Sequence, residues 1–529
     1  MKRRLILGVH SGHDASACLL EDNKIKIAIA KERITRKKHD SGEPIESIDY
    51  ILKHEGIEKK DIDLVVRCNW FDSKELDDNY YKEFKNVIIN KNHHLFHAYA
   101  GTLCCKKLPC IIVVVDGRGS RPVDVGLLNN KLSENTYYEA ESIYIYDGNE
   151  LKLLEKRFGE YFKDKYKWGS HLDSLGYAYS ALSKCVFGSE YAAGKIMALA
   201  AFGQEDKSIP KVFKYGYGQE FKVCEEWLNI LQNSNLPISW KDEVTKNMAF
   251  SLQNGLEEYM EFRLKQLKER YGVNNFVISG GVGLNCKNNG LLANKDFIDT
   301  LGVYPASGDD GLSIGAAIWG YKNISKDNSN KIIWNYDLGK DYSKGRRINY
   351  STISKEIALL LKENKFIGVF TRGSEYGPRA LGNRSILCNA SSVELKDKLN
   401  KNIKHREVFR PFGGIILSKN LSEVTKDKLA SPYMISAVKF NDKARDKYKA
   451  ITHIDGTVRI QVVEDINSLV GNILLEYEKL TKDKILINTS FNGREEPIVE
   501  TEEEALNTAK RIGLDYLVIE DKLIRIREV

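Results

Sequence analysis

Short apolar runs that end in polar or glycine-containing turns recur along this chain of 529 residues, and helix-like segments alternate with them. Leu5–Val9 runs into the polar turn Gly8–Asp14, and Ile111–Val115 ends in Asp116. The other strand-like runs are Ala15–Leu20, Lys26–Ala30, Leu64–Arg67, Asn86–Ile89, Phe276–Ile278, Phe366–Phe370, Ile415–Leu417, Val458–Val463, Lys484–Asn488 and Tyr516–Ile519. Strands that alternate with helices, such as the one expected over Ile45–His54, predict a mixed α/β fold.

The length and one polar stretch indicate how the chain is divided. At the usual 100 to 200 residues per domain, the chain has room for about three domains or for two large ones. Residues 170–200 are rich in small residues and predict helix, whereas Ser325–Ser351 is polar with little periodicity. We therefore expect a linker over Ser325–Ser351 and a second, smaller α/β unit after it.

The composition is that of a soluble globular enzyme. Hydrophobic residues make up 42% of the chain and charged residues 29%, which excludes collagen-like and disordered chains. The 80 Lys and Arg residues exceed the 73 Asp and Glu residues by only seven. This excess leaves room for anionic ligands but does not predict a nucleic-acid partner.

The nine cysteines contain no C-x-x-C pair, and most lie in apolar segments. We therefore expect reduced, buried thiols and a cytoplasmic protein, and we expect neither a zinc ribbon nor a cysteine-ligated iron–sulfur cluster. The basic start resembles a signal peptide, but His10, His13 and Asp14 interrupt its apolar region. No apolar stretch approaches the roughly 18 residues of a membrane span, so no membrane association is predicted.

A histidine pair and two acidic loops predict a metal site. His93 and His97 are four residues apart, so on a helix both imidazoles share one face and can reach one ion. Asp116 follows a buried strand, and a second acidic loop contains Asp309 and Asp310, of which Asp309 is the preferred ligand and Asp310 the alternative. Two imidazoles with carboxylates suit Fe(II), Mn(II) or Zn(II), although a packed helix face would give the same histidine spacing.

A glycine-rich turn follows the strand Phe276–Ile278. Gly280 and Gly281 would let backbone N–H groups approach a nucleotide closely, and Asn285 and Asn289 would share one helical face. The pattern is neither a P-loop nor the dinucleotide-binding G-x-G-x-x-G motif. By itself it fits an ordinary turn equally well.

A basic cluster lies beyond the expected linker. Its members are Arg372, Arg379, Arg384, Lys404, Arg406 and Arg410, and Arg494 adds a further guanidinium beside Asn488–Asn492. Guanidinium forks bind phosphate in a bidentate manner, and neighbouring hydroxyls and amides suit the remaining oxygens. The cluster therefore predicts an oxyanion pocket, although each arginine alone fits a surface salt bridge equally well.

An ordered set of motifs extends over essentially the whole chain. The motifs are Gly8–Ala17, Glu32-Arg33, Lys37-Lys38-His39, His93-His94-x-x-His97, Asp116-Gly117, Ala193–Ala200, Ser279–Val282, Gly308–Gly311, Glu375–Ser385, Phe409–Phe412 and Asn488–Asn492. In this order they resemble the O-carbamoyltransferase family of the nodulation protein U and cephem hydroxymethyl carbamoyltransferase type. Arg118 and Ala198 depart from the residues expected at their positions.

The resemblance implies a two-domain, ATP-dependent carbamoyltransferase. Residues 1–340 would form an actin-like ATPase domain, of the fold shared with the universal threonylcarbamoyl transferase. Residues 350–529 would form an α/β domain resembling threonylcarbamoyl-adenylate synthase. The partners implied are ATP, carbamoyl phosphate and a small-molecule hydroxyl acceptor, such as a sugar or a natural-product alcohol; a homodimer is also compatible.

The resemblance also assigns roles to residues in two steps. In the second domain, carbamoyl phosphate and ATP would give a carbamoyl-adenylate. The residues implied there are the catalytic Arg379, Lys404 and Arg410, and the nucleotide-binding Arg406, Asn488, Ser490, Asn492 and Arg494. In the first domain, the metal would be held by His93, His97, Asp116 and Asp309, with Fe(II) preferred and Mn(II), Zn(II) or Mg(II) as alternatives. The nucleotide would contact Lys195, Gly280, Gly281, Val282, Asn285 and Asp309.

For transfer to the alcohol, His13 is the expected base and Asp14 its orienting partner. Lys38, His39 and Arg67 are expected to border the acceptor. Three alternatives stay open: threonylcarbamoyl-type tRNA modification, hydrogenase-maturation carbamoyl transfer and an actin-fold sugar kinase. The hydrogenase-maturation family carries C-x-x-C fingers that this chain lacks.

Overall fold

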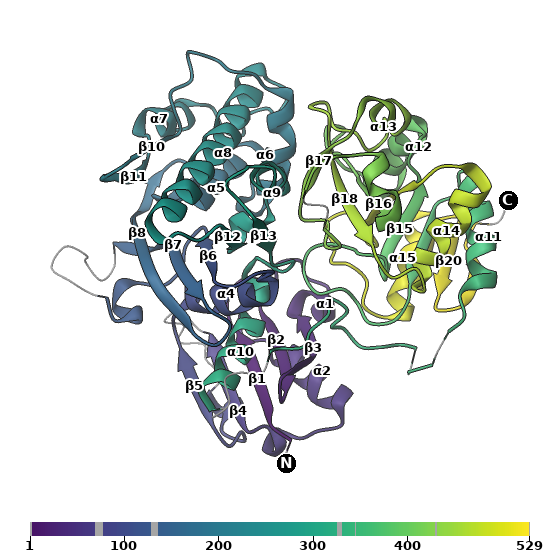
Figure 1. Ribbon diagram of the computed structural model, residues 1–529, viewed down its shortest axis with the longest axis horizontal. Coiled ribbons are helices and arrows are strands. Elements are labelled where there is room, and N and C mark those ends of the chain that lie inside the picture. Colours follow the sequence, from purple (N-terminus) through teal and green to yellow (C-terminus); the bar gives the residue numbers. More distant parts are fainter. Residues whose placement is uncertain are drawn as a thin grey trace. The chain divides into compact units, whose positions relative to one another are not determined.

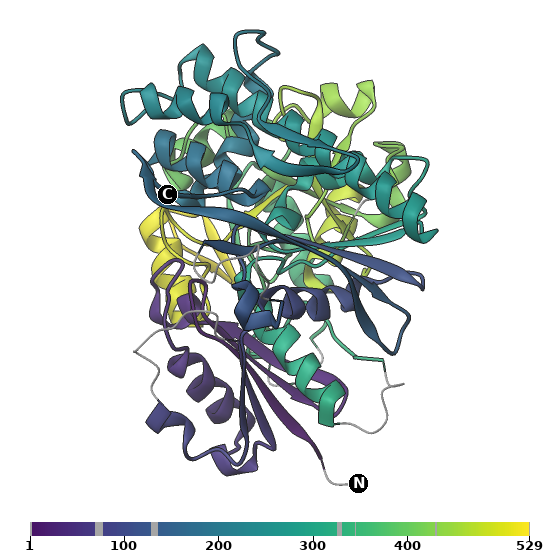
Figure 2. The ribbon, with the colours of Figure 1, turned by 90° about the vertical axis from the view of Figure 1, so that its left-hand side faces the viewer.

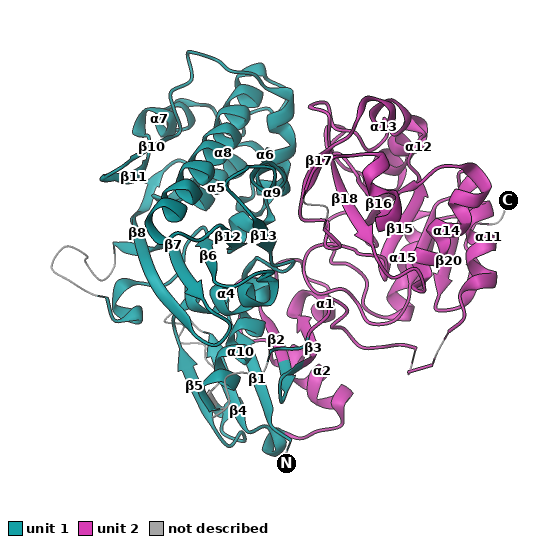
Figure 3. Cartoon of the chain, in the orientation of Figure 1, with its two compact units in different colours: residues 1–12, 19–24, 59–333 teal, residues 13–18, 25–58, 334–529 magenta. Residues whose placement is uncertain are grey.

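The computed structural model confirms the α/β class (Figure 1). It describes residues 3–68, 78–127, 136–324, 331–343, 345–346, 348–428 and 431–527. The chain divides into two compact units (Figure 3). Unit 1 comprises residues 1–12, 19–24 and 59–333, and unit 2 comprises residues 13–18, 25–58 and 334–529. The division into domains 1–340 and 350–529 stays a prediction, and two N-terminal segments group with the C-terminal residues in unit 2.

Unit 1 contains parallel and antiparallel strands. Its strands are β1 (Leu5–His10), β4 (Leu64–Cys68), β5 (Val87–Asn90), β6 (Cys110–Val115), β7 (Tyr137–Tyr146), β8 (Leu151–Tyr166), β9 (Gly169–Leu172), β10 (Phe213–Gly216), β11 (Gln219–Val223), β12 (Asn275–Ser279) and β13 (Thr300–Val303), and β2 (Ser16–Glu21) is shared with unit 2. Its α-helices are α3 (Asp78–Tyr81), α4 (His93–Gly101), α5 (Leu175–Phe187), α6 (Ala193–Leu199), α7 (Glu225–Asn233), α8 (Glu243–Tyr271), α9 (Cys286–Ala293) and α10 (Leu312–Ile324). β4 pairs in parallel with β1 and β5. A six-stranded sheet has the order β13-β12-β6-β7-β8-β9, in which the long β7 and β8 run side by side (Figure 2).

The ends of two parallel strands position one candidate site. Every residue of β6 is buried, and β6 pairs in parallel with β12, with Val114 opposite Ser279. The loops at the carboxyl ends of both strands therefore meet at one edge of the sheet, where α/β folds place their sites. Gly280 has a φ of +85°, and a Cβ there would lie 2.4 Å from the Val115 carbonyl oxygen, so only glycine fits.

Helix α10 packs against α4 in the same unit. A Cβ at Gly315 would lie 1.9 Å from the carbonyl oxygen of Phe96, so the two backbones are in close contact. Asp309 lies in a short 3-10 turn (Asp309–Gly311) that leads directly into α10. The close packing of α10 on α4 therefore brings this acidic loop to the helix that carries His93 and His97.

Unit 2 is built on an eight-stranded mixed sheet with the order β17-β18-β16-β19-β15-β14-β20-β21. The strands of unit 2 are β3 (Lys24–Ala30), β14 (Ile367–Phe370), β15 (Arg384–Asn389), β16 (Gly413–Leu417), β17 (Ala437–Lys439), β18 (Thr457–Val463), β19 (Ile485–Ser490), β20 (Tyr516–Ile519) and β21 (Lys522–Arg525). Its α-helices are α1 (Lys31–Thr35), α2 (Ile45–Glu55), α11 (Ser351–Lys362), α12 (Val393–Lys398), α13 (Asp442–Lys447), α14 (Leu469–Thr481) and α15 (Glu502–Ile512). One apolar core includes side chains of α11 and α14, and a second includes side chains of α12 and α15.

The predicted linker Ser325–Ser351 contains the change from unit 1 to unit 2 at residues 333–334, but the part of it that the structure describes is packed rather than free. Residues 331–343 are packed: Leu338 is buried, its carbonyl accepts from the Ala28 N–H at 3.0 Å, and the Gly339 N–H donates to the Ser374 carbonyl at 3.0 Å. Residues 325–330, 344 and 347 lie outside the described residues. In the sequence, a polar segment rich in turn residues resembles a free linker. The hydrogen bonds that such a segment makes to distant residues leave no local pattern.

The other expectations are mostly confirmed. Each strand-like run predicted from the sequence overlaps an observed strand, and α2 covers the predicted helix Ile45–His54. Helix over all of residues 170–200 is wrong at its start, because Gly169–Leu172 forms β9. All nine cysteines are free thiols. Over the residues that the structure describes, no helix has both the length and the apolar character needed to cross a membrane.

Candidate active sites

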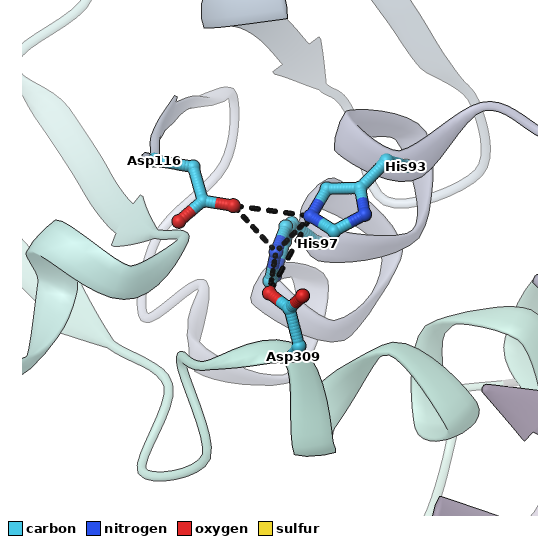
Figure 4. Close-up of side chains that lie close together, drawn as sticks. All are labelled: His93, His97, Asp116 and Asp309. Carbon is cyan, nitrogen blue, oxygen red and sulfur yellow. Dashed lines mark hydrogen bonds and ion pairs between the residues drawn. The ribbon is translucent and has the colours of Figure 1, made fainter. Parts of the chain in front are cut away.

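Four side chains of unit 1 converge on one point, and they are the predicted metal ligands (Figure 4). The Nε2 atoms of His93 and His97 are 3.1 Å apart. His93 Nε2 lies 3.0 Å from Asp116 Oδ2 and 3.5 Å from Asp309 Oδ1. His97 Nε2 lies 3.5 Å from each of the same two oxygens. All four side chains are buried.

Neighbouring hydrogen bonds fix the orientation of these groups. His93 begins α4, where the Asn92 side chain caps the helix by accepting from the Leu95 N–H at 3.2 Å. The Gly281 N–H donates to Asp116 Oδ1 at 3.0 Å, which leaves Oδ2 directed at the histidines. The His97 carbonyl accepts from Ser279 Oγ at 2.8 Å. Supports of this kind hold metal ligands in a fixed geometry.

The geometry and charge of this cluster fit a divalent metal ion. Two ligand atoms about 2.1 Å from a common ion lie roughly 3.0–3.4 Å apart at ordinary coordination angles, close to the observed separations. Burial by itself lowers the pKa of His93, but Asp309 and Asp116 outweigh burial and raise this pKa to about 10. Burial works against ionisation of Asp116, yet the two histidines hold its pKa below the ordinary range. Without a metal, protons therefore take the place of the cation between the carboxylates.

Sequence reasoning missed His10 of β1. His10 is fully buried, its Nε2 lies 3.9 Å from Asp309 Oδ2, and its ring meets that of His93 edge-on at 6.4 Å. It therefore faces the Asp309 oxygen that points away from the other histidines. The only signal in the sequence was its place in the polar turn that follows Leu5–Val9.

The neighbouring His94 is not part of the metal cluster. Its Nδ1 lies 2.8 Å from Ser142 Oγ, and burial lowers its pKa to about 3. It is therefore neutral and packed in the unit 1 core.

The residues of unit 1 that are predicted to contact the nucleotide differ in the groups that surround them. Gly281 borders Asp116, and Val282 is buried beside it. Asn285 caps α9 by accepting from the Asn288 N–H at 3.1 Å and donates to Gln253 Oε1 at 2.9 Å. Lys195 lies on α6 with its Nζ 4.9 Å from the Phe187 ring centroid. A nucleotide role for these residues stays a prediction.

In unit 2, Lys404 is the centre of a second cluster. It ends a short π-helical turn (Leu399–Lys404), and its Nζ donates to the Ser490 carbonyl at 2.9 Å. The same Nζ donates to the Asn492 carbonyl at 2.9 Å and to Asn492 Oδ1 at 2.7 Å. The structure therefore brings together three of the predicted adenylate-site residues at the end of β19.

Two arginines place positive charge near this lysine, and a third lies near those two arginines. Burial lowers the pKa of Lys404 well below its ordinary value, and Arg406 and Arg410 lower it further. Burial also lowers the pKa values of Arg406 and Arg410, and Arg459 adds to both shifts. Like charges gathered in a partly buried place are stabilised by an anion. Arg459, on β18, was missed because nothing in its local sequence resembles a phosphate motif.

The remaining predicted residues of unit 2 lie around this cluster or apart from it. Asn488 is fully buried and donates to the Ala380 carbonyl at 3.1 Å, beside the half-buried Arg379. Arg494 lies in the loop after Asn492, with its side chain 66% exposed and paired with Glu495. Their roles as ligand contacts stay predictions.

Two arginines of the predicted basic cluster have other surroundings. Arg384 is completely buried, donates to the Thr371 carbonyl at 2.7 Å and stacks on Phe370 at 3.7 Å. Arg372 is exposed, with a φ of +49°, and its N–H donates to Glu520 Oε1 at 2.8 Å. Arg384 therefore holds the turn after β14 from inside, through hydrogen bonds to backbone carbonyls of that turn.

The residues expected around the transfer base lie in unit 2, apart from Arg67. Asp14 Oδ1 lies 2.7 Å from His39 Nδ1, whereas Asp14 Oδ2 lies 3.4 Å from His13 Nδ1. Asp14 therefore orients His39 more closely than the expected His13. Lys38 is exposed, and its charge adds to the lowering of the Lys404 pKa. Arg67 is buried on β4 in unit 1, with its guanidinium 3.9 Å from the Tyr81 ring centroid.

The buried two-histidine, two-carboxylate cluster of unit 1 could hold a metal ion, and the partly buried cationic cluster of unit 2 could hold an anion. Two family models match the chain, Carbamoyltransferase N-terminus over residues 5–103 and 136–318, and Carbamoyltransferase C-terminus over residues 358–526. The chain therefore belongs to the carbamoyltransferase family. Asp116 lies between the two matched parts of the N-terminal model, so its place in the cluster comes from the structure.

Curated relatives extend over nearly the whole chain. Nodulation protein NolNO of Sinorhizobium fredii is 26% identical over 97% of this chain and 79% of its own length. The uncharacterized protein MJ1051 of Methanocaldococcus jannaschii is 27% identical over 98% of this chain and 99% of its own. Nodulation protein U of Sinorhizobium fredii is 32% identical over 57% of this chain and 58% of its own.

Similarity to solved structures is weaker. Full-length HypF, in a phosphate- and nucleotide-bound form, aligns at a TM-score of 0.40 and 14% identity over 62% of this chain and 57% of its own. A glucokinase of the ROK family from Streptomyces griseus aligns at a TM-score of 0.28 and 14% identity over 59% of this chain and 98% of its own. Neither similarity is close enough to define the fold of either unit, so the actin-like assignment rests on the family resemblance of the sequence.

Proposed function

We propose that this chain is an O-carbamoyltransferase that activates carbamoyl phosphate with ATP and transfers the carbamoyl group to a hydroxyl of a small molecule. The observation that carries the proposal is the cluster around Lys404. It gathers Lys404, Arg406, Arg410 and Arg459 in the part of the chain that matches the carbamoyltransferase C-terminus. Such a concentration of cations suits a reaction in which phosphate groups enter and leave.

In the proposed first step, carbamoyl phosphate, ATP and one water give carbamoyl-adenylate, pyrophosphate and phosphate. Water cleaves carbamoyl phosphate to carbamate and phosphate, and a carbamate oxygen then attacks the α-phosphorus of ATP. The bond from that phosphorus to the pyrophosphate oxygen breaks. Lys404, Arg379 and Arg410 would stabilise the charge on the phosphate oxygens, while Arg406, Asn488, Ser490, Asn492 and Arg494 would hold the nucleotide.

In the proposed second step, the oxygen of an alcohol attacks the carbamoyl carbon, AMP leaves, and the alcohol gives up its proton. His93, His97, Asp116 and Asp309 would hold the divalent metal, which supplies Lewis-acid stabilisation of developing negative charge. The adenylate would contact Lys195, Gly280, Gly281, Val282 and Asn285. The proton would pass to His13 or His39, both of which lie near Asp14. Lys38 and Arg67 would border the acceptor.

The test uses the chain of 529 residues and measures two things separately: the phosphate-containing products and the fate of the carbamoyl carbon. With ATP, carbamoyl phosphate and Mg(II) but no acceptor, we expect release of pyrophosphate and phosphate. Release of ADP with a phosphorylated sugar, independent of carbamoyl phosphate, would instead indicate a kinase. Carbon-labelled carbamoyl phosphate offered with a panel of sugars and natural-product alcohols should then label the acceptor, and absence of pyrophosphate release would contradict the adenylate step.

The metal is a separate part of the proposal. Two imidazoles and two carboxylates suit Fe(II), and Mn(II) and Zn(II) fit the same donors. Elemental analysis of protein purified without added metal, followed by reconstitution with each ion, would identify the metal that restores transfer. Iron is the expected result.

A further inference from the structure

Two arginines near the start of the chain contact backbone carbonyls far away in the sequence. Arg33 is buried in α1, and its Nη2 donates to the Gly377 carbonyl at 3.1 Å. Arg36, three residues later, caps the end of α1. Both residues belong to unit 2, and neither takes part in the chemistry proposed above.

Arg36 holds one loop of unit 2 at two neighbouring points. Its Nη1 donates to the Ile498 carbonyl at 2.8 Å, and its Nη2 donates to the Pro497 carbonyl at 2.7 Å. The guanidinium also lies 3.3 Å from Glu504 Oε2, at the start of α15. A planar fork that satisfies two adjacent carbonyls fixes both the position and the direction of the backbone.

The other end of the same loop holds Lys404. Asn492 Nδ2 donates to the Glu496 carbonyl at 2.7 Å, so the loop is closed on itself just before the carbonyls that Arg36 contacts. Asn492 provides two of the oxygens that accept from Lys404 Nζ, at 2.7 and 2.9 Å. A shift of Pro497 would therefore be transmitted over a few residues to the oxygens that hold the Lys404 amine.

A second observation places this N-terminal segment near the cationic cluster. Lys38, two residues after Arg36, is among the charges that lower the pKa of Lys404, after burial, Arg406 and Arg410. The segment after α1 therefore reaches the Lys404 cluster as well as the loop that supports it.

We infer that Arg36 is a positioning residue of the phosphate-handling site of unit 2, which it maintains by fixing the loop from Asn492 to Ile498. The inference rests on the proposed function, because it assumes that Lys404 acts on the phosphate groups of ATP or carbamoyl phosphate. Arg36 itself touches none of them. Arg36 affects the position of the Lys404 ammonium and the number of oxygens that accept hydrogen bonds from it.

The variants are Arg36→Lys and Arg36→Ala in the full-length chain. Arg36→Lys keeps the positive charge beside Glu504 but loses the fork, so at least one of the two carbonyls loses its partner. Lys37→Ala is the matched control, because Lys37 is exposed on the same segment. The measurement is pyrophosphate release from ATP and carbamoyl phosphate without acceptor, with KM and kcat determined separately from pH 7.5 to 9.5.

We expect Arg36→Ala and Arg36→Lys to raise the KM for carbamoyl phosphate or ATP about tenfold and to move the alkaline limb of the pH profile, whereas Lys37→Ala leaves both unchanged. Thermal unfolding of each variant reports whether the chain is folded. A role in stability alone would lower the unfolding temperature while the folded enzyme keeps the wild-type KM and pH limb, and that result would overturn the inference. If the wild-type chain releases no pyrophosphate, the proposed function itself fails, which is a different outcome.

Discussion

The two candidate sites are opposites in charge. In unit 1, two histidines face two carboxylates, and the Nε2–O separations of 3.0–3.5 Å leave a place for one cation. In unit 2, burial and neighbouring arginines lower the pKa values of Lys404, Arg406 and Arg410, so the cluster favours an anion. A buried cluster of ionisable groups is stabilised by a ligand of the charge that balances it, so the composition of the cluster indicates the kind of ligand. One unit is thus suited to hold a metal ion, and the other to hold phosphate.

The largest expected effect is at the unit 1 cluster. His93→Ala removes one of four ligands, so we expect loss of bound metal and a fall in carbamoyl transfer of roughly 10³-fold, since a Lewis-acid metal stabilises the transition state by several kcal/mol. Elemental analysis and labelled carbamoyl phosphate measure the two losses.

Pyrophosphate release is the internal control for His93→Ala, because it belongs to the other unit in the proposed scheme. We expect it to stay within about twofold of the wild type. Retention of both metal and transfer in the variant would contradict the metal assignment and remove the contrast between the sites.

The next largest effect is expected at the cationic cluster of unit 2, where pyrophosphate release should fall while metal content does not change. Lys404→Met keeps much of the apolar stem but removes the ammonium that donates to Ser490 and Asn492. We expect pyrophosphate release to fall on the order of 10²–10³-fold, the usual loss when one charged donor is removed from a developing oxyanion. Metal content should not change, and a variant with wild-type pyrophosphate release would show that the cationic cluster has another use.

The cluster in unit 1 could be predicted from the sequence more completely than the one in unit 2. His93 and His97 are one helical turn apart, and Asp116 ends a buried strand, so periodicity and strand ends carry most of the information. The convergence of Asp309 on the pair required the family resemblance, because no local pattern relates residues that far apart.

Other features could not be predicted because they depend on contacts between distant segments. Arg459 lies inside an ordinary strand, His10 inside another, and their charges matter only through neighbours brought together by folding. The grouping of α1 with the C-terminal residues depends on hydrogen bonds such as those from Arg36 to Pro497 and Ile498. Such long-range pairs leave no trace in propensity or spacing, and neither does the packing of residues 331–343.

A smaller effect would decide which histidine is the base. Asp14 Oδ1 lies closer to His39 Nδ1 than Oδ2 does to His13 Nδ1, 2.7 Å against 3.4 Å. Asp14→Asn removes the carboxylate that lies against both imidazoles, so we expect transfer to fall about 10–10²-fold with little change in pyrophosphate release. Comparison of His13→Gln with His39→Gln in the same assay assigns the base. Equal loss of pyrophosphate release and transfer in Asp14→Asn would show that Asp14 instead supports the unit 2 site.

The smallest effect comes from the titration of Lys404. Burial and the neighbouring cations lower its pKa well below the ordinary lysine value of 10.5, so in the free enzyme the amine loses its proton at a lower pH than an exposed lysine does. An anion binds the protonated amine, so the affinity falls as the pH rises through this lowered pKa. Between pH 7.5 and 9.5, where carbamoyl phosphate and ATP keep a constant charge, we expect the KM for carbamoyl phosphate to rise by up to about tenfold per pH unit once the pKa is passed. The residual activity of Lys404→Met should lack this rise, because the titrating group is gone. If the wild-type KM stayed flat over this range and Lys404→Met bound carbamoyl phosphate with the same KM, the anion would not need the ammonium of Lys404, and the phosphate role would fall to the arginines alone.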